Sequence, residues 1–310
     1  MKTTQNYDFI GDIHGQYGKL NALLLKLGYV PSGEGFWHPE GRKVVFLGDY
    51  IDRGPQVREV LLAVRAMVES GNALAIMGNH EFNAVCCQTQ DGQGGWLRNK
   101  RDGGYLVTLG QFAGREAEWA DWLEWMKRLP MALDLGAVRA VHACWDAVGI
   151  AVLAGRDLTD GDFLKACATR GTAEFTAVDH VLKGPEMNLP DGRVYFDKEG
   201  HERHRVRVRW WDLPAAPEIG EMTMPEPTDL SGAVDPQDLT RLPNYPAEAP
   251  PVFFGHYWMK PRKELRPVWK NLACLDYSAA SVGPLVAYRW EGEQTLCASK
   301  MVAVGGGGNA

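Results

Sequence analysis

The feature that most constrains this chain is an apolar run, residues 44–47, that leads directly into two carboxylates and an arginine. Residues 48–54 read Gly-Asp-Tyr-Ile-Asp-Arg-Gly, and an apolar run that ends in Gly-Asp is typical of a buried strand opening onto a loop. Such a loop places Asp49 and Asp52 at the carboxyl edge of a sheet, where open α/β folds bind their ligands. Together with Arg53 they suit a metal-bound phosphate, because carboxylates ligate hard cations and a guanidinium binds phosphoryl oxygens. By itself, the segment is equally typical of a solvated loop with one salt bridge.

Four further apolar runs end near a side chain that can bind a metal. They are residues 7–10, 73–77, 137–141 and 252–254. Helical patterns lie between the first three of the five runs, and strands that alternate with helices bring their carboxyl ends to one edge of a sheet. We therefore expect the loops after the five runs to meet. In chain order, these loops carry Asp12 and His14, Asp49 and Asp52, Asn79 and His80, His142, and His256.

The composition is that of a globular protein with a sizeable core. The 310 residues are 45% hydrophobic and 23% charged, which suffices for one large domain or two small ones. The net charge of −6 gives no reason to expect nucleic acid or a membrane as a partner. No apolar run approaches the ~18 residues of a membrane span, and no leader is evident. Six cysteines without CxxC spacing predict reduced thiols in a cytoplasmic protein, and the glycine-rich residues 305–310 predict a disordered tail.

These motifs resemble the calcineurin-like metallophosphoesterases. More narrowly, they resemble the phosphoprotein-phosphatase branch and the bacterial diadenosine-tetraphosphatases related to it, whose signature is GDxHG, GDxxDRG, GNHE and two isolated histidines. The corresponding positions here are residues 11–15, 48–54 and 78–81, followed by His142 and His256.

The resemblance covers about 1–145 and about 250–290, and it implies an α/β fold of a particular kind. We expect a four-layer αββα metallophosphoesterase sandwich, formed as a single domain over residues 1–300. An insert at about 180–250 would lie in the substrate region.

The resemblance also implies a binuclear metal centre. One metal would be held by Asp12 and His14, the other by Asn79, His142 and His256, with Asp49 bridging them. Mixed imidazole and carboxylate ligands suit Mn, Fe or Zn rather than Mg or Ca alone, and we expect Mn to serve in vitro. Two such ions can clamp an in-line displacement at phosphorus, with a metal-bridging hydroxide as the attacking group and no phosphoenzyme.

Two residues would act directly on the phosphate, and a third would orient one of them. Arg53 would bind the phosphoryl oxygens and offset their growing charge. His80 is not a metal ligand in the family. It would protonate the leaving oxygen, with Asp52 orienting its ring and raising its pKa. The alternative is that His80 and Asp52 form a pair that only supports Asn79.

The chain departs from the pattern of the protein phosphatases in several places. Residues 142–146 read His-Ala-Cys-Trp-Asp where the family has His-Ala-Gly or His-Gly-Gly, and Met77 stands where those enzymes carry an arginine. Their second phosphate-binding arginine has no evident counterpart. These differences leave the protein-serine/threonine substrate open but do not affect the metal ligands.

The insert has its own pattern. Residues 205–210 alternate arginine with Val, Val and Trp, which predicts a strand with three arginines on one face. We expect it to form a hairpin with residues 194–196, followed by an irregular Pro-rich stretch over 214–251. The arginine face is either a solvated edge or a second anion-binding surface in which Arg207 or Arg209 contacts phosphate. Nearby aromatic residues, which could stack a nucleobase or belong to the core, are Trp96, Trp145 and Trp258.

The predicted function is metal-dependent hydrolysis of phosphomonoesters, on either a phosphoprotein or a small phosphorylated molecule. The first alternative is hydrolysis of dinucleoside polyphosphates of the diadenosine tetraphosphate type. Removal of 2′,3′-cyclic or nucleic-acid-end phosphates is a further alternative that the mild acidity disfavours. A non-catalytic scaffold that binds phosphorylated partners is the alternative from another class. The sequence does not predict the oligomeric state.

Overall fold

Two β-sheets carry the five predicted runs. The computed structural model describes residues 5–99, 103–189, 194–196, 202–211, 218–224, 242–260 and 264–305. The first sheet has the order β15 (Met301–Val304), β14 (Leu285–Trp290), β1 (Tyr7–Ile10), β4 (Lys43–Phe46) and β5 (Ala73–Ala75). The second has the order β13 (Leu272–Cys274), β12 (Val252–Phe254), β7 (Arg139–Val141) and β6 (Ala132–Asp134). The strands β1, β4 and β5 run parallel, as do β7, β12 and β13.

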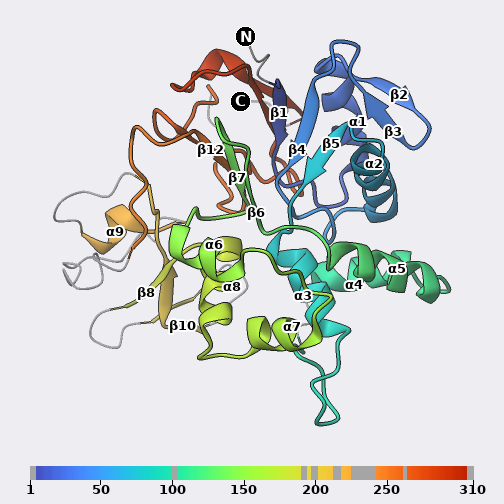
Figure 1. Ribbon diagram of the computed structural model, residues 1–310, viewed down its shortest axis with the longest axis vertical. Helices are drawn as coiled ribbons and strands as arrows, with labels where there is room; N and C mark the ends of the chain where they lie inside the picture. Colours follow the sequence, from blue (N-terminus) through green and yellow to red (C-terminus); the bar gives the residue numbers. More distant parts are fainter. Residues whose placement is uncertain are drawn as a thin grey trace.

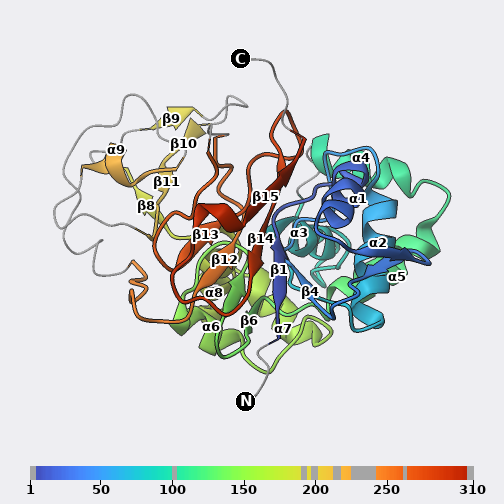
Figure 2. The same ribbon diagram turned by 90° about the horizontal axis from the view of Figure 1, so that it is seen from above.

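The two sheets pack face to face (Figures 1 and 2), and aromatic side chains fill the space between them. The ring of Phe9 in β1 stacks on Phe253 in β12 with 4.0 Å between centroids, and Phe253 lies 4.9 Å from Tyr288 in β14. All three side chains are fully buried. This core holds the carboxyl ends of β1 and β4 close to those of β7 and β12.

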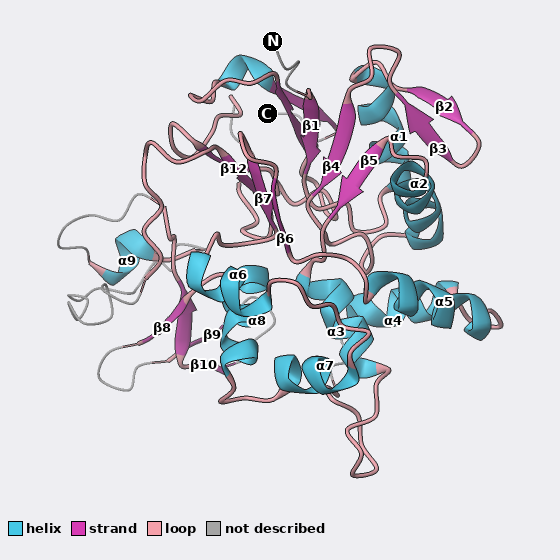
Figure 3. Cartoon of the chain, in the orientation of Figure 1, coloured by secondary structure: helices cyan, strands magenta, loops and turns pink. Residues whose placement is uncertain are grey.

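Two helices pack against the first sheet. α1 (Tyr17–Lys26) packs against β14 and β15, and α2 (Val57–Glu69) packs against β5 and against the hairpin of β2 (Val30–Ser32) and β3 (Gly35–Trp37). In the view of Figure 3 the next six helices lie below the sheets. They are α3 (Asn79–Cys87), α4 (Gly103–Gln111), α5 (Glu116–Met126), α6 (Ala147–Leu153), α7 (Gly161–Ala168) and α8 (Ala173–Lys183). The predicted α/β class and the αββα sandwich are thus confirmed.

The strand pairing predicted for the insert is wrong. β11 (Arg205–Arg207) pairs with β8 (Glu186–Asn188), whereas β9 (Tyr195–Phe196) pairs with β10 (Glu202–Arg203). The reason is that the register of β11 places Val206 opposite Met187, and both join a small apolar cluster with Ile219 of α9 (Ile219–Met222). The predicted alternation is confirmed, because Val206, Val208 and Trp210 are buried while the intervening arginines are partly or fully exposed.

Some predictions fall on residues that the structure does not describe. These are residues 306–310 of the predicted tail and residues 214–217 and 225–241 of the Pro-rich stretch.

The last part of the described chain adds the short 3₁₀ helix η2 (Ala298–Lys300) before β15. Among the described residues, no helix has both the length and the apolarity that crossing a membrane requires.

Candidate metal centre

The five strand ends meet around the carboxylate of Asp49. Its Oδ2 lies 3.5 Å from Nε2 of His14, and its Oδ1 lies 3.4 Å from Nε2 of His142. His142 Nε2 is also 3.1 Å from Oδ1 of Asn79. All four side chains are buried. Asp49 therefore stands between two sets of donors, one on each of its oxygens.

Asp12 and His256 complete the cluster. Both oxygens of Asp12 lie close to the backbone N–H of His256, at 3.1 and 3.3 Å, which ties the end of β1 to the end of β12. One ligand atom from each of Asp49, His142 and His256 lies within 4.8 Å of the others, and so do ligand atoms of His14, Asp49 and His80. The structure thus brings together all six residues that the sequence predicted as metal ligands, with His80 beside them.

The histidine rings are oriented as metal ligands require. Nδ1 of His14 lies 2.8 Å from the carbonyl oxygen of Ile51, and Nδ1 of His142 lies 2.7 Å from that of Leu47. A ring whose Nδ1–H donates to a carbonyl keeps its lone pair on Nε2, and in both rings Nε2 faces Asp49. Nε2 of His256 is buried with no hydrogen-bond partner among the described residues. An unsatisfied buried nitrogen in such a donor set fits a metal ligand.

The electric field of the cluster favours a cation. Burial and the nearby carboxylate of Asp276 raise the pKa of Asp12 well above its usual value. Burial acts in the same direction on Asp49, but the neighbouring histidines outweigh it and hold the pKa of Asp49 well below its usual value. Although burial opposes it, the Asp49 carboxylate raises the pKa of His142 to about 10. Positive charge is therefore stabilised on His142, whereas burial holds the pKa values of His14 and His256 well below their usual value; a metal ion would supply the charge in place of the His142 proton.

The predicted pair of His80 and Asp52 is present, and a third residue holds it. Nδ1 of His80 lies 2.5 Å from Oδ2 of Asp52. The hydroxyl of Thr108, in α4, donates to Oδ1 of Asp52 at 2.6 Å and accepts the backbone N–H of Asp52 at 2.9 Å. His80 Nε2 faces the cluster, 3.9 Å from Oδ2 of Asp49. Asp52 is thus fixed between Thr108 and the imidazole that it orients.

Arg53 lies between the two histidines nearest to it. Its Nη1 is 2.8 Å from Nε2 of His14, and its Nη2 is 3.3 Å from Nε2 of His80. The guanidinium also lies over the ring of Trp258, with 4.5 Å from Cζ to the ring centroid. Both terminal nitrogens of this planar cation face the cluster, so the guanidinium is suited to bind a phosphoryl group there.

A buried carboxylate that the sequence analysis did not single out, Glu81, shapes the central loop. Its oxygens accept the backbone N–H groups of Asp49 and Tyr50 at 2.8 Å and of Gly78 at 2.9 Å. Burial raises the pKa of Glu81 to about 7. Its signal was available, because Glu81 stands three residues after Gly78, the spacing at which a glutamate in the first turn of a helix accepts the backbone N–H of the N-cap residue.

The loops are tightly constrained around these carboxylates. A Cβ on Gly78 would lie 2.2 Å from Oδ1 of Asp49, and one on Gly255 would lie 1.9 Å from Oδ1 of Asp12. Several site residues adopt a left-handed backbone, which is uncommon outside glycine and concentrates at functional sites. They are His14 (φ 44°), Asp49 (54°), Asp52 (71°), Arg53 (67°) and His256 (67°).

The two insert arginines differ in their relation to the cluster. Arg207 is the neighbour that, after burial, does most to lower the pKa of His256, and its Cζ lies 5.8 Å from the ring of Tyr257. Arg209 is held by a backbone bond from its N–H to the carbonyl of Met222. No described contact places the guanidinium of Arg209 at the cluster. Arg207 alone of the two is thus placed near a predicted ligand.

The tryptophans singled out earlier also differ. Trp145 is buried, with Arg139 over its ring at 4.8 Å, which makes it a core residue. Trp96 is 37% exposed and lies in the loop closed by the bridge between Gln90 and Trp96. Trp258 is 45% exposed and covers Arg53.

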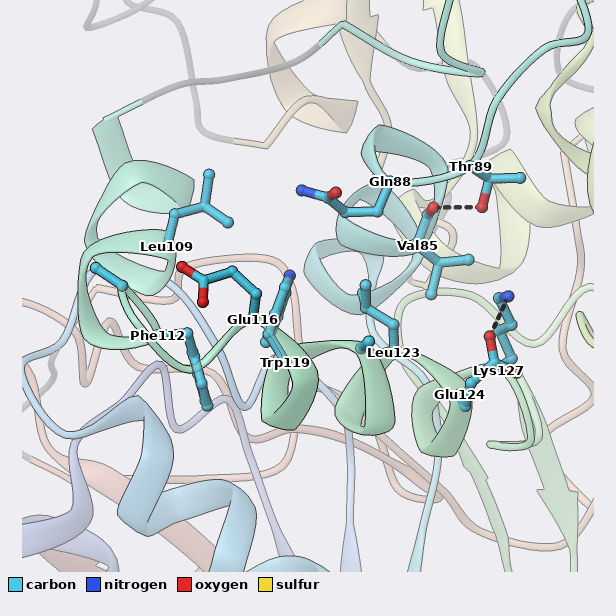
Figure 4. Close-up of a pocket in the computed structure, with 12 residues that line it drawn as sticks. Val85, Gln88, Thr89, Leu109, Phe112, Glu116, Trp119, Leu123, Glu124 and Lys127 are labelled. Carbon is cyan, nitrogen blue, oxygen red and sulfur yellow. Dashed lines mark hydrogen bonds and ion pairs between the residues drawn. The ribbon is translucent and has the colours of Figure 1, made fainter.

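A separate cavity of about 530 Å³ lies among α3, α4 and α5 (Figure 4). Its lining includes Val85, Leu109, Phe112 and Trp119, and none of the predicted site residues lines it. Two of the helices that line the cavity, α3 and α4, also carry His80 and Thr108.

Comparison with known proteins agrees with this geometry. Residues 6–150 match the calcineurin-like phosphoesterase family. The asymmetrical bis(5′-nucleosyl)-tetraphosphatases PrpE of Anoxybacillus flavithermus and Bacillus subtilis are each 46% identical to this chain over 74 residues, which is 24% of this chain. The chain spans about 30% of the length of these curated relatives.

One solved structure supports the fold over the full length. The protein serine/threonine phosphatase from Saccharomyces cerevisiae with similarity to human phosphatase PP5 is 16% identical, with a TM-score of 0.50. The alignment covers 100% of this chain and 82% of the yeast chain. Residues 6–150 thus match a calcineurin-like phosphoesterase domain, and they supply five of the six predicted ligands of the cluster around Asp49, all except His256.

Proposed function

We propose that this protein is a metal-dependent phosphoester hydrolase with two metal ions at the cluster around Asp49. The observation that carries the proposal is the convergence of five strand ends on that one buried carboxylate, with a histidine Nε2 near each of its oxygens. When bound, the ions would supply Lewis acidity and an activated water. The residues that would hold them are Asp12, His14 and Asp49 on one side, and Asp49, Asn79, His142 and His256 on the other.

The chain's own residues would perform the remaining steps. Arg53 would bind the phosphoryl oxygens through both terminal nitrogens and balance the charge that builds on them. His80 would donate a proton from Nε2 to the leaving oxygen, since Asp52 holds its Nδ1. The imidazole and carboxylate donors suit Mn, Fe or Zn, and we propose Mn for assays in vitro. We propose a cytoplasmic location, in which the six cysteines would be reduced thiols.

The proposed substrate is a phosphomonoester on a protein or a small molecule. Dinucleoside polyphosphates are the second candidate, because the curated relatives that match over 74 residues are named as bis(5′-nucleosyl)-tetraphosphatases. Arg207 near His256 supports the second candidate, since a dinucleoside polyphosphate has phosphate groups beyond the one at the metals, whereas a phosphomonoester has only one.

The experiment is a comparison of rates on p-nitrophenyl phosphate, a phosphopeptide and diadenosine tetraphosphate with Mn²⁺ present. We expect hydrolysis that chelator abolishes and renewed Mn²⁺ restores. A faster rate on the phosphopeptide would favour the phosphomonoesterase, and a faster rate on diadenosine tetraphosphate would favour the second candidate. Absence of metal-dependent turnover on all three would contradict the proposal and favour a scaffold that binds phosphorylated partners.

A further inference from the structure

Trp258 covers the face of Arg53, whose guanidinium points into the cluster. The Arg53 Cζ lies 4.5 Å from the centre of the Trp258 ring, while Nη1 and Nη2 lie near His14 and His80. A guanidinium that stacks on an indole keeps its N–H groups free, because they lie in the plane of the cation. The ring therefore restrains Arg53 without occupying the edge that would bind phosphate.

The backbone of Trp258 is held in an unfavourable conformation that places the ring there. Its φ is 46°, in the left-handed region that bulky side chains rarely adopt. The buried carboxylate of Asp276 stabilises this turn, because its Oδ2 accepts the N–H of Trp258 at 2.8 Å and its Oδ1 accepts that of Ser278 at 2.9 Å. The carbonyl of Asp276 also accepts the N–H of Met259 at 2.8 Å. Asp276 thus supports the strained turn through two hydrogen bonds, from the N–H groups of Trp258 and Met259, and strain supported in this way indicates a function for the side chain that the turn orients.

The exposure of Trp258 argues against a purely structural role. The residue is 45% exposed, so it contributes less to the core than the buried aromatic residues nearby, such as Tyr257. Arg53 is only partly buried, and without the ring its guanidinium would sample more rotamers in water. A mobile guanidinium binds an anion more weakly, because the side chain loses conformational entropy when binding fixes it in one rotamer.

We propose that Trp258 is a positioning residue that fixes the guanidinium of Arg53 for phosphate binding, with Asp276 holding Trp258 in place. The inference rests on the proposed function, in which Arg53 binds the phosphoryl oxygens.

The test compares Trp258→Leu and Trp258→Phe with the wild type. Leu keeps apolar bulk but loses the aromatic face, whereas Phe keeps an aromatic face. The matched control is Trp37→Leu, since Trp37 in β3 has a similar exposed fraction, 43%, and its hairpin carries none of the site residues. Two quantities are measured on Mn²⁺-loaded protein: the Kd for inorganic phosphate by calorimetry, and kcat/KM for p-nitrophenyl phosphate.

We expect Trp258→Leu to weaken phosphate binding and to lower kcat/KM by about 2- to 30-fold, the range that a cation–π contact supports. Trp258→Phe should recover part of the loss, and Trp37→Leu should match the wild type. In an Arg53→Ala background, adding Trp258→Leu should change either quantity by less than about twofold, because the group that the ring positions is gone.

The outcomes separate this inference from the proposed function. Wild-type values for Trp258→Leu, or equal losses with and without Arg53, would overturn the positioning role while leaving the hydrolase intact. If the wild type binds phosphate but hydrolyses no ester, the proposed function fails, and the phosphate Kd values still decide the role of Trp258. Thermal unfolding of each variant identifies any loss that comes from misfolding.

Discussion

His80 Nδ1 lies 2.5 Å from Oδ2 of Asp52, and the other oxygen of that carboxylate accepts the hydroxyl of Thr108. This chain of contacts fixes which imidazole nitrogen faces the cluster. Nε2 points toward Asp49, while Nδ1 is committed to Asp52. The arrangement suits a general acid better than a residue that only supports Asn79, because the two ring nitrogens of His80 face Asp52 and Asp49 and not the side chain of Asn79.

Replacing His80 with Ala should leave the metals bound and lower turnover. The imidazole would be needed most when the leaving oxygen is a poor leaving group, so the loss should reach about 10²–10⁴-fold for alkyl phosphates. For p-nitrophenyl phosphate, whose leaving group needs little protonation, the loss should be smaller. The measurement is kcat/KM over a series of phosphate esters, together with the metal content of each sample. Equal losses along the series would exclude the general-acid role.

Thr108→Val should disturb Asp52 without touching the metals. Valine keeps the shape of threonine but removes the hydroxyl, which leaves the N–H and one carboxylate oxygen of Asp52 without their partner. A buried group left unsatisfied costs about 1–3 kcal/mol, and urea unfolding should show a loss of this size. Turnover should fall together with stability, since His80 depends on Asp52. Thr108→Ser retains the hydroxyl and should restore turnover, so a Ser variant as impaired as Val would argue against the contact.

Asp49→Asn should abolish both metal loading and activity. The amide keeps the size of the side chain but removes the charge that both sets of donors share. Metal analysis after dialysis should find no bound metal in Asp49→Asn, in contrast to the wild type. Hydrolysis of p-nitrophenyl phosphate should be lost even with excess Mn²⁺. Asp121→Asn, at an exposed surface ion pair with Arg65, is the matched control and should behave as the wild type. Full metal occupancy in Asp49→Asn would show that this carboxylate is not the bridge.

The cluster could be predicted from the sequence because each ligand follows its strand within a few residues. Asp12 and Asp49 are each fixed by a strand and its following turn, and parallel strands bring these turns to one edge. Thr108 could not be predicted, because it reaches Asp52 from 56 residues away and belongs to a helix with no motif of its own. The pairing of β11 was also beyond reach, since an alternating strand specifies its buried face but not its neighbour.

The pair of Asp146 and His180 allows a pH prediction away from the metals. Oδ2 of Asp146 lies 2.9 Å from Nδ1 of His180, and Oδ1 accepts the N–H of Val148 at the start of α6, which ties that helix to α8. The hydrogen bond with His180 outweighs burial and lowers the pKa of Asp146 below its usual value. A lowered folded-state pKa gives a contribution to stability that is present above the unfolded-state pKa, about 3.9, and is lost as the pH falls through the folded value.

The free energy of unfolding should therefore decline below about pH 4 in part through this residue. Asp146→Asn keeps an oxygen that can accept the Val148 N–H but cannot titrate, so its stability should fall less steeply with acid than that of the wild type. Asp146→Ala removes the helix cap as well, which should cost about 1 kcal/mol more at neutral pH. Urea unfolding of the three proteins between pH 3 and pH 7 provides the comparison. Parallel pH curves for Asn and wild type would mean that the charge of Asp146 does not stabilise the junction of α6 and α8.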